Sequence, residues 1–260
     1  MFLFSPKEVA VEFCNSGIYK SNLDTKRFAL LAILGGAFIA LGGLLTVIVA
    51  GGMPGLALDN PGMIKFIAGC IFPVGLIMVT IAGADLFTSD CAGVVLPYLE
   101  RKITVVAVFK VLAISYIFNF VGAQFIAYFL SSSVGLLDSD PWRSYLHNLA
   151  YSKTSLDFYT VFMKGIGANW LVCLGAWMGF AGKDLVSKSL GIWIPVMMFV
   201  TLGYEHSIAN MFFIPAAIYS GAEITWSYFL VSNLIPATLG NIVGGSLLVG
   251  GLYWYIYMKK

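Results

Sequence analysis

The sequence predicts an all-α protein that crosses a membrane six times, and three observations carry this prediction. Hydrophobic residues make up 59% of the chain and charged residues only 11%, with a mean hydropathy of +0.88. This composition lies far outside the range of water-soluble globular proteins. The apolar residues form long charge-free runs, and two of these runs contain related, interrupted segments. We therefore expect a polytopic membrane protein built from two similar halves.

Seven charge-free runs are candidates for membrane-spanning helices, namely 28–58, 66–84, 111–137, 165–182, 189–204, 207–222 and 224–258. A span needs about 20 apolar residues, because the hydrocarbon core is about 30 Å thick. Runs 189–204 and 207–222 are too short, since each extends only about 24 Å at 1.5 Å per residue. We expect them to be two halves of one span, broken at 203–207, which leaves six spans. Such a break is tolerated where it lines a cavity within the protein.

The distribution of positive charge predicts the orientation of the spans. When six spans are assumed, only four of the fifteen Lys and Arg residues fall on the side away from the chain ends, namely Lys65, Arg143, Lys153 and Lys164. Positive residues gather in cytoplasmic loops, so both termini are predicted to be cytoplasmic and the protein to lie in the cell (inner) membrane. The net charge of +2 reflects this split and gives no indication of a nucleic-acid partner.

The predicted organisation has four parts. Residues 1–27 form a cytoplasmic segment with an amphipathic helix, because Val9, Ala10, Phe13, Cys14 and Ile18 can share one apolar face. A first three-helix repeat (28–131), an extracytoplasmic loop (132–155) and a second three-helix repeat (156–258) follow.

An internal repeat links the two halves. The first half reads PVGLIMVTIAGADLFTSD from Pro73, and the second reads PVMMFVTLGYEHSIAN from Pro195. Each segment lies in the second span of its half, and the segment around Asp85 is predicted to break its helix as the one around Glu205 does. Three spans is an odd number, so the halves must have opposite orientations in the membrane. Inverted repeats with broken helices are typical of transporters and channels, whose site lies near the midplane.

Ionisable residues within the spans are the first candidates for function, because they are costly at membrane depth. In the repeat, Glu205 has a counterpart in Asp85, which suggests that both acids brace a break. His206 aligns with Leu86 and is one of only two histidines in the chain. His206 is therefore the leading candidate for a functional side chain.

Three motifs resemble the formate/nitrite transporter family: DLFTS at 85–89, NWLVCL at 169–174 and GYEHSIANM at 203–211. The resemblance extends over nearly the whole chain. It implies a homopentamer of aquaporin-like protomers in membrane lipid, each with its own pore for a small monovalent anion, with no enzymatic activity, cofactor or metal. Residues 211–215 are more similar to formate members, so formate is the expected substrate, and nitrite or hydrosulfide is the alternative.

The resemblance also implies roles for individual residues. It assigns a cytoplasmic constriction to Phe72, Leu76 and Phe199, and a periplasmic-side constriction to Leu86, Phe87 and Val172. Thr88 and His206 match the pair in the central chamber, and Lys153 matches a basic residue near the pore entrance. A supporting polar network comprises Asn169, Glu205, Asn210 and, from the repeat, Asp85.

These residues suggest a proton-coupled mechanism. An apolar constriction rejects a bare anion because dehydrating a charge is costly, whereas a neutral weak acid crosses far more easily. Histidine, with an unperturbed pKa of about 6.5, can exchange a proton under physiological conditions. Lys153 and the positive ends of the broken half-helices would attract the anion. Two routes fit these residues: His206 donates the proton itself, or bulk protons reach an anion held there.

A membrane-embedded enzyme is a remote alternative. Haem ligation between spans usually requires two intramembrane histidines, and His206 is alone. Asp85 and Asp90 could suggest an aspartyl protease, but they are five residues apart in one segment instead of on two facing helices. The four cysteines lack metal-ligand spacing and are expected to be small buried residues.

Overall fold

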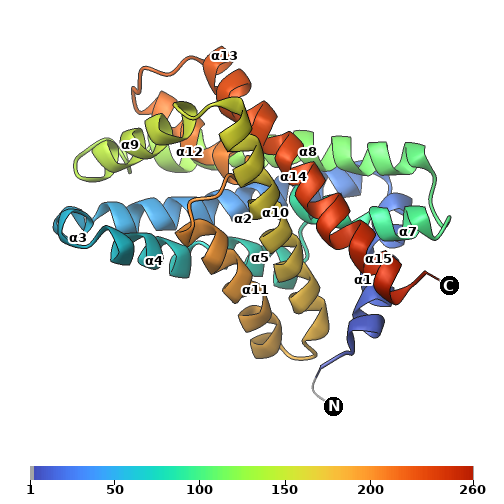
Figure 1. Cartoon of the computed structure of the whole chain (residues 1–260). Helices are drawn as coiled ribbons and strands as arrows, with labels where there is room; N and C mark the ends of the chain where they lie inside the picture. Colours follow the sequence, from blue (N-terminus) through green and yellow to red (C-terminus); the bar gives the residue numbers. More distant parts are fainter. Residues whose placement is uncertain (1–2, 260) are drawn as a thin grey trace.

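The computed structural model describes residues 3–259, which form a helical protein (Figure 1). The first half contains α1 (Pro6–Asn22), α2 (Thr25–Gly51), α3 (Pro54–Asp59), α4 (Pro61–Ile71), α5 (Val74–Ala82), α6 (Phe87–Gly93), α7 (Val95–Leu99), α8 (Val105–Ala127) and the π-helical turn η1 (Tyr128–Ser132). The connecting segment, predicted as a loop, contains the helix α9 (Trp142–Thr154).

The second half repeats the pattern of one continuous helix, one broken helix and one continuous helix. It contains α10 (Phe158–Ala181), α11 (Leu185–Thr201), α12 (Ser207–Tyr219), α13 (Trp226–Phe229), η2 (Leu230–Leu234), α14 (Ile235–Gly245), η3 (Ser246–Gly251) and α15 (Leu252–Tyr257). Within the described chain, five helical stretches are long and apolar enough to cross a membrane, and α11 and α12 are shorter apolar helices. With α11 and α12 as one interrupted crossing, the predicted six spans are confirmed.

Both predicted breaks are present. In the first half, α5 ends at Ala82 and α6 begins at Phe87; in the second, α11 ends at Thr201 and α12 begins at Ser207. A glycine follows each upstream helix closely, and both adopt the left-handed conformation, with φ of 80° at Gly83 and 69° at Gly203. Only glycine takes this conformation at little cost, so these residues allow the chain to leave the helix abruptly.

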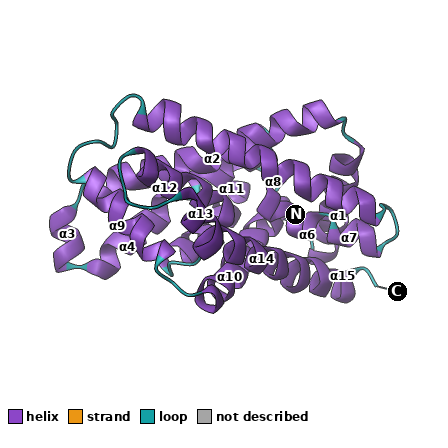
Figure 2. Ribbon diagram, turned by 90° about the horizontal axis from the view of Figure 1, so that it is seen from above, coloured by secondary structure: helices purple, strands orange, loops and turns teal. Residues whose placement is uncertain are grey.

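The short helices after the breaks lie inside the protein. In Figure 2, α6 lies between α8 on one side and α14 and α15 on the other. Every residue of α12 from Ser207 to Ala217 is buried. Because α12 is hydrophobic all round and enclosed by its neighbours, its first turn is held in the interior of the molecule.

Helix α1 closes one end of the molecule. The side chain of Ser5 caps it by accepting a hydrogen bond from the backbone N–H of Glu8. The carboxylate of Glu8 in turn accepts a hydrogen bond from the backbone N–H of Ser5 (2.7 Å). Its predicted apolar face is confirmed, because Val9, Ala10 and Phe13 are buried. The helix packs against α7, α10 and α15, so the two ends of the chain lie on the same side (Figure 1).

Candidate functional site

An asparagine from the third crossing of each half holds the neighbouring break in place. In the first half, Asn119 of α8 donates hydrogen bonds from Nδ2 to the carbonyl oxygens of Ala32 (2.7 Å) and Asp85 (2.9 Å). Its Oδ1 accepts the backbone N–H of Phe87 (2.9 Å). One side chain therefore satisfies both a carbonyl of the break and an N–H at the start of α6, groups that have no partner within the helices.

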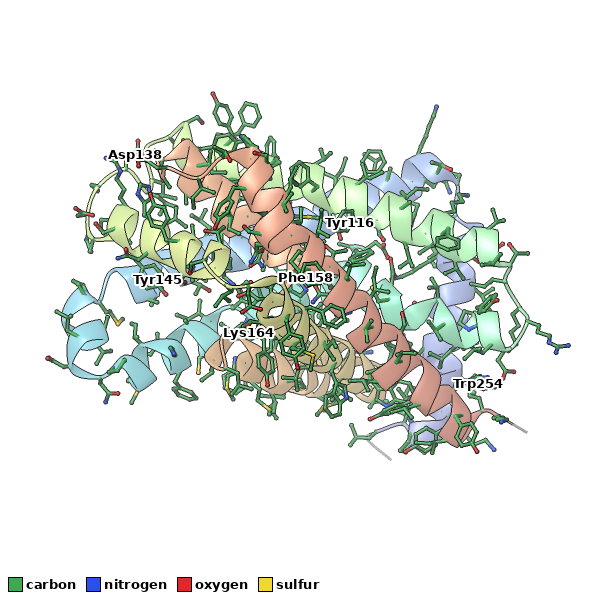
Figure 3. The ribbon with its side chains drawn as sticks, turned by 45° about the horizontal axis from the view of Figure 1, so that its top comes forward. Tyr116, Asp138, Tyr145, Phe158, Lys164 and Trp254 are labelled. Carbon is green, nitrogen blue, oxygen red and sulfur yellow. The ribbon has the colours of Figure 1, made fainter. Side chains whose placement is uncertain are left out.

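The second half uses the same arrangement. Asn241 of α14 donates to the carbonyl oxygens of Gly165 and Glu205, both at 2.9 Å, and accepts the N–H of Ser207 (2.8 Å). The carbonyl of Lys164, labelled on α10 in Figure 3, accepts the N–H of Glu205 (3.4 Å). Neither asparagine was among the predicted site residues. The shared pattern Asn-x-Val-Gly, at 119–122 and 241–244, is the signal that could have found them.

These supports place His206 and Thr88 opposite each other. His206 Nε2 lies 3.0 Å from Thr88 Oγ1, and both side chains are buried. His206 is also the N-cap of α12, because its Nδ1 accepts the backbone N–H of Ala209 (3.1 Å). An Nδ1 that accepts a bond cannot carry a proton, so the neutral ring carries its proton on Nε2 and directs it toward Thr88.

His206 borders a narrow apolar passage between the two broken helices. The passage is too tight for a water molecule. It is lined by Ile39, Phe72, Leu76, Leu86, Val172, Val196, Phe199 and His206. Five of the predicted constriction residues, Phe72, Leu76, Leu86, Val172 and Phe199, are therefore brought together at this one place.

Residues of both predicted constrictions meet at this one passage. Phe72 and Phe199, predicted for the cytoplasmic constriction, pack on each other (5.8 Å between ring centroids), and Phe72 also packs on Phe213 of α12 (6.2 Å). Leu86, predicted for the periplasmic-side constriction, lines the same passage and also borders the cavity beside α1. The assignment of these residues to two sides of the membrane stays a prediction.

Phe87 does not line this passage. Its ring packs edge-on against Tyr116 of α8, with 4.8 Å between centroids, and Tyr116 in turn hydrogen-bonds Thr238 (2.9 Å; Figure 3 labels Tyr116). Because Phe87 starts α6 with its N–H bound to Asn119, its side chain faces α8 instead of the passage. The predicted constriction role of Phe87 is therefore not supported by its position.

Glu205 is the centre of a buried polar network. Both of its oxygens accept bonds from Lys153 Nζ (3.1 and 3.2 Å), and Oε2 also accepts from Asn210 (2.7 Å) and Asn233 (3.1 Å). Lys153 lies in the last turn of α9 with only 12% of its side chain exposed. The predicted entrance residue is thus half of a shielded ion pair instead of a free loop charge. Asn233 was not predicted.

Asn169 connects the two halves. Its Nδ2 donates to the carbonyl oxygens of Thr88 (3.0 Å) and Asn241 (2.6 Å), and so ties α6 to α14. Because Thr88 belongs to the first half and Asn241 to the second, this side chain fixes the distance between the two breaks. The geometry of the His206 and Thr88 pair depends on it.

Asp85 also forms an ion pair with a lysine. Lys20 Nζ, from α1, lies 2.6 Å from Asp85 Oδ1 and 2.6 Å from Asp90 Oδ1. Lys20 also borders a cavity of about 160 Å³ between α1, the end of α5 and α10, whose lining includes Phe13, Gly83, Leu86, Ser89 and Phe180. Leu86 is shared by this cavity and the central passage, and so separates the two.

Known proteins with similar sequences and structures agree with this architecture. Residues 7–255 match the sequence profile of the family described as formate/nitrite transporter. The chain is 40% identical to a probable formate transporter of Methanothermobacter thermautotrophicus, with 98% of both chains covered. Its fold resembles that of an FNT family ion channel (TM-score 0.88, 29% identity, 96% and 98% covered). It also resembles a pentameric formate channel with formate bound (TM-score 0.78, 32% identity, 90% and 98% covered).

Proposed function

Because the chain belongs to the formate/nitrite transporter family, we propose that it is a membrane channel for a small monovalent anion, and that this anion is formate. Family members are channels and transporters, so the chain is not an enzyme. The observation that carries the proposal is the buried pair of His206 and Thr88 beside an apolar passage. Formate is preferred because both the Methanothermobacter relative and the pentameric channel are named for it.

The pair has the chemistry to hold a small anion or its acid. Nε2–H of His206 and the Thr88 hydroxyl can both donate a hydrogen bond to a carboxylate oxygen placed between them. The first turn of α12, capped by His206, contributes the partial positive charge of a helix N-terminus. These groups are polar but carry no full charge, so they stabilise an anion without trapping it.

The surrounding passage favours the neutral acid. Phe72, Leu76 and Phe199 offer no hydrogen-bond partner, so an anion that passes them must give up water without replacement. We propose that formate gains a proton before it crosses this region and loses it beyond. A second proton on the His206 ring would have to displace the bond from the Ala209 N–H. We therefore infer that His206 acts as a neutral donor and that the transported proton travels on the acid.

We further propose that the chain forms a homopentamer with one pore in each protomer, and that both termini face the cytoplasm. The similar channel with formate bound is pentameric. In the single chain, only 22% of an 18-residue apolar stretch of α8 and η1 is buried. This leaves an extensive apolar face for lipid or for neighbouring protomers.

The test is uptake of formate, nitrite and hydrosulfide by proteoliposomes at acidic and alkaline pH. We expect formate uptake to be fastest and to increase at acidic pH. His206→Phe should reduce it by about tenfold or more, because a charged substrate loses a hydrogen-bond donor worth roughly 1.5–3 kcal/mol. The control is His147→Phe, which changes the other histidine, a residue of α9 that hydrogen-bonds Ser220 (2.9 Å), and should leave uptake unchanged. Uptake by His206→Phe at the wild-type rate would contradict the proposal, and preferred uptake of nitrite or hydrosulfide would change the substrate.

A further inference from the structure

The cluster of Lys20, Asp85 and Asp90 contains one more acid than base. Both aspartates are essentially fully buried, with exposed side-chain fractions of 2% and 0%, and Lys20 is 21% exposed. The Lys20 ammonium lies 2.6 Å from an oxygen of each carboxylate. One cation therefore contacts both acids, and the two carboxyl groups share a single site. If both acids were ionised, a buried negative charge would remain uncompensated.

The second half of the molecule shows what a balanced cluster looks like. There, Lys153 pairs with Glu205, and the residue five positions after the acid is Asn210. In the first half the residue five positions after Asp85 is Asp90. The repeat thus places a carboxyl group where the related cluster has an amide. An amide donates a hydrogen bond to the neighbouring carboxylate, and a carboxyl group can do so only when it is protonated.

The hydrogen bonds of the cluster are incomplete as well. Among the described residues, Asp85 Oδ1, Asp85 Oδ2 and Asp90 Oδ2 are buried without a hydrogen-bond partner, although Asp85 Oδ1 is close to the Lys20 charge. Buried oxygens without donors are costly, and two carboxylates that share one site do not both ionise readily. A single proton shared by the pair supplies the missing donor and leaves the cluster neutral.

We propose that Asp85 and Asp90 form a proton-binding site that holds one shared proton at neutral pH, in an ion pair with Lys20. The site is separate from His206, because Lys20 borders the cavity beside α1, His206 borders the central passage, and Leu86 lies between the two. Its ligand is the proton itself, which the two carboxyl groups share.

The other charged and titratable groups near the pair do not replace this proton. The thiols of Cys91 on α6 and Cys173 on α10 are buried and, with an unperturbed pKa of about 8.5, uncharged at neutral pH. Helix α14 and η3 carry no ionisable side chain. The remaining charged residues of the packed helices α1, α2 and α8 are exposed, namely Lys7, Glu8, Glu12, Lys26, Arg27 and Lys110.

The site controls the charge beside the cavity next to α1, where Lys20 forms part of the wall. With the shared proton the cluster is neutral, and without it the cluster carries one negative charge that repels an arriving anion. If the chain conducts an anion, as proposed above, loss of the shared proton at alkaline pH slows the passage of that anion on the α1 side. A local charge of this kind changes the rate at which a charged ligand arrives by roughly tenfold or more.

Infrared spectroscopy tests the proton directly, without transport. The reconstituted wild-type protein should show the carbonyl stretch of a protonated carboxyl group between about pH 6 and pH 9, where ordinary carboxyl groups are ionised. Asp90→Asn should remove this band, because the remaining Asp85 then matches Lys20 in charge. Lys20→Gln should extend the band to more alkaline pH, because the compensating cation is lost. Asp24→Asn is the control: it changes an exposed N-cap carboxylate to an amide and should leave the band intact.

The same variants measure the effect on transport. Relative to wild type, Asp90→Asn should pass formate about tenfold faster at alkaline pH and at the same rate at acidic pH. A band that survives in Asp90→Asn, or that is absent from the wild type, overturns the proton-binding site. A band that behaves as expected in a protein that transports no anion leaves the site standing and refutes the proposed function, so the two failures are distinguishable.

Discussion

At the scale of single residues, some buried polar groups near the second break form a side-chain network and others face the passage. Glu205, Asn210 and Asn233 bond mainly to each other and to Lys153, whereas His206 and Thr88 meet beside the passage. Glu205 and His206 are neighbours in the sequence, yet the side chain of Glu205 belongs to the polar network and that of His206 borders the passage. The fold separates them because His206 caps α12 while Glu205 turns toward α9.

The Lys153 and Glu205 pair provides a prediction about stability. Lys153→Met removes the cation from a carboxylate that is 2% exposed and should destabilise the protein by about 3–5 kcal/mol. The double variant with Glu205→Gln should recover much of this loss, because no uncompensated charge is left. Thermal unfolding in detergent measures both. If the single variant were as stable as the wild type, the ion pair would contribute nothing to the fold.

At the scale of secondary-structure elements, each broken helix depends on a side chain from another crossing. The apolar runs and glycines around the breaks were enough to predict where the helices stop. They did not show what Asn119 and Asn241 contact, because an asparagine in an apolar span has the same sequence context whether it faces a backbone, a pore or a partner. Only the packing of α8 and α14 against the breaks brings these amides to the orphaned backbone groups.

Removing either amide should therefore weaken its break. Asn241→Ala leaves the N–H of Ser207 and two carbonyl oxygens without this partner, at a cost of about 1–3 kcal/mol for each buried group left unsatisfied. Asn119→Ala should behave similarly. Thermal unfolding of the purified variants measures the loss, with the exposed Asn22→Ala as control. Equal melting temperatures for Asn241→Ala and Asn22→Ala would contradict a supporting role.

At the scale of the whole molecule, the topology places α1 and the chain ends on one side and α3 and α9 toward the other. The excess of Lys and Arg around the chain ends predicts that this side is cytoplasmic. Because the native cysteines are buried or only partly exposed, cysteines added at exposed positions can report sidedness.

Two such positions are Glu12 on α1 and Asp59 at the end of α3. We expect Glu12→Cys to be labelled by a membrane-impermeant thiol reagent only after the cytoplasmic side is opened. Asp59→Cys should be labelled in intact cells. Unmodified protein gives the background from native cysteines, and the reverse pattern of labelling would invert the predicted orientation.

The sequence by itself determined the class, the number of crossings, the positions of both breaks and the inverted repeat. These follow from hydrophobic run length and from glycine, which act locally along the chain. Tertiary structure decided which side chains meet: Asn119 and Asn241 at the breaks, Lys153 at Glu205, and Lys20 between two aspartates. It also brought Phe72 and Leu86, predicted for different constrictions, to one passage. These contacts join residues far apart in the sequence, so only the packing of the helices against each other could decide them.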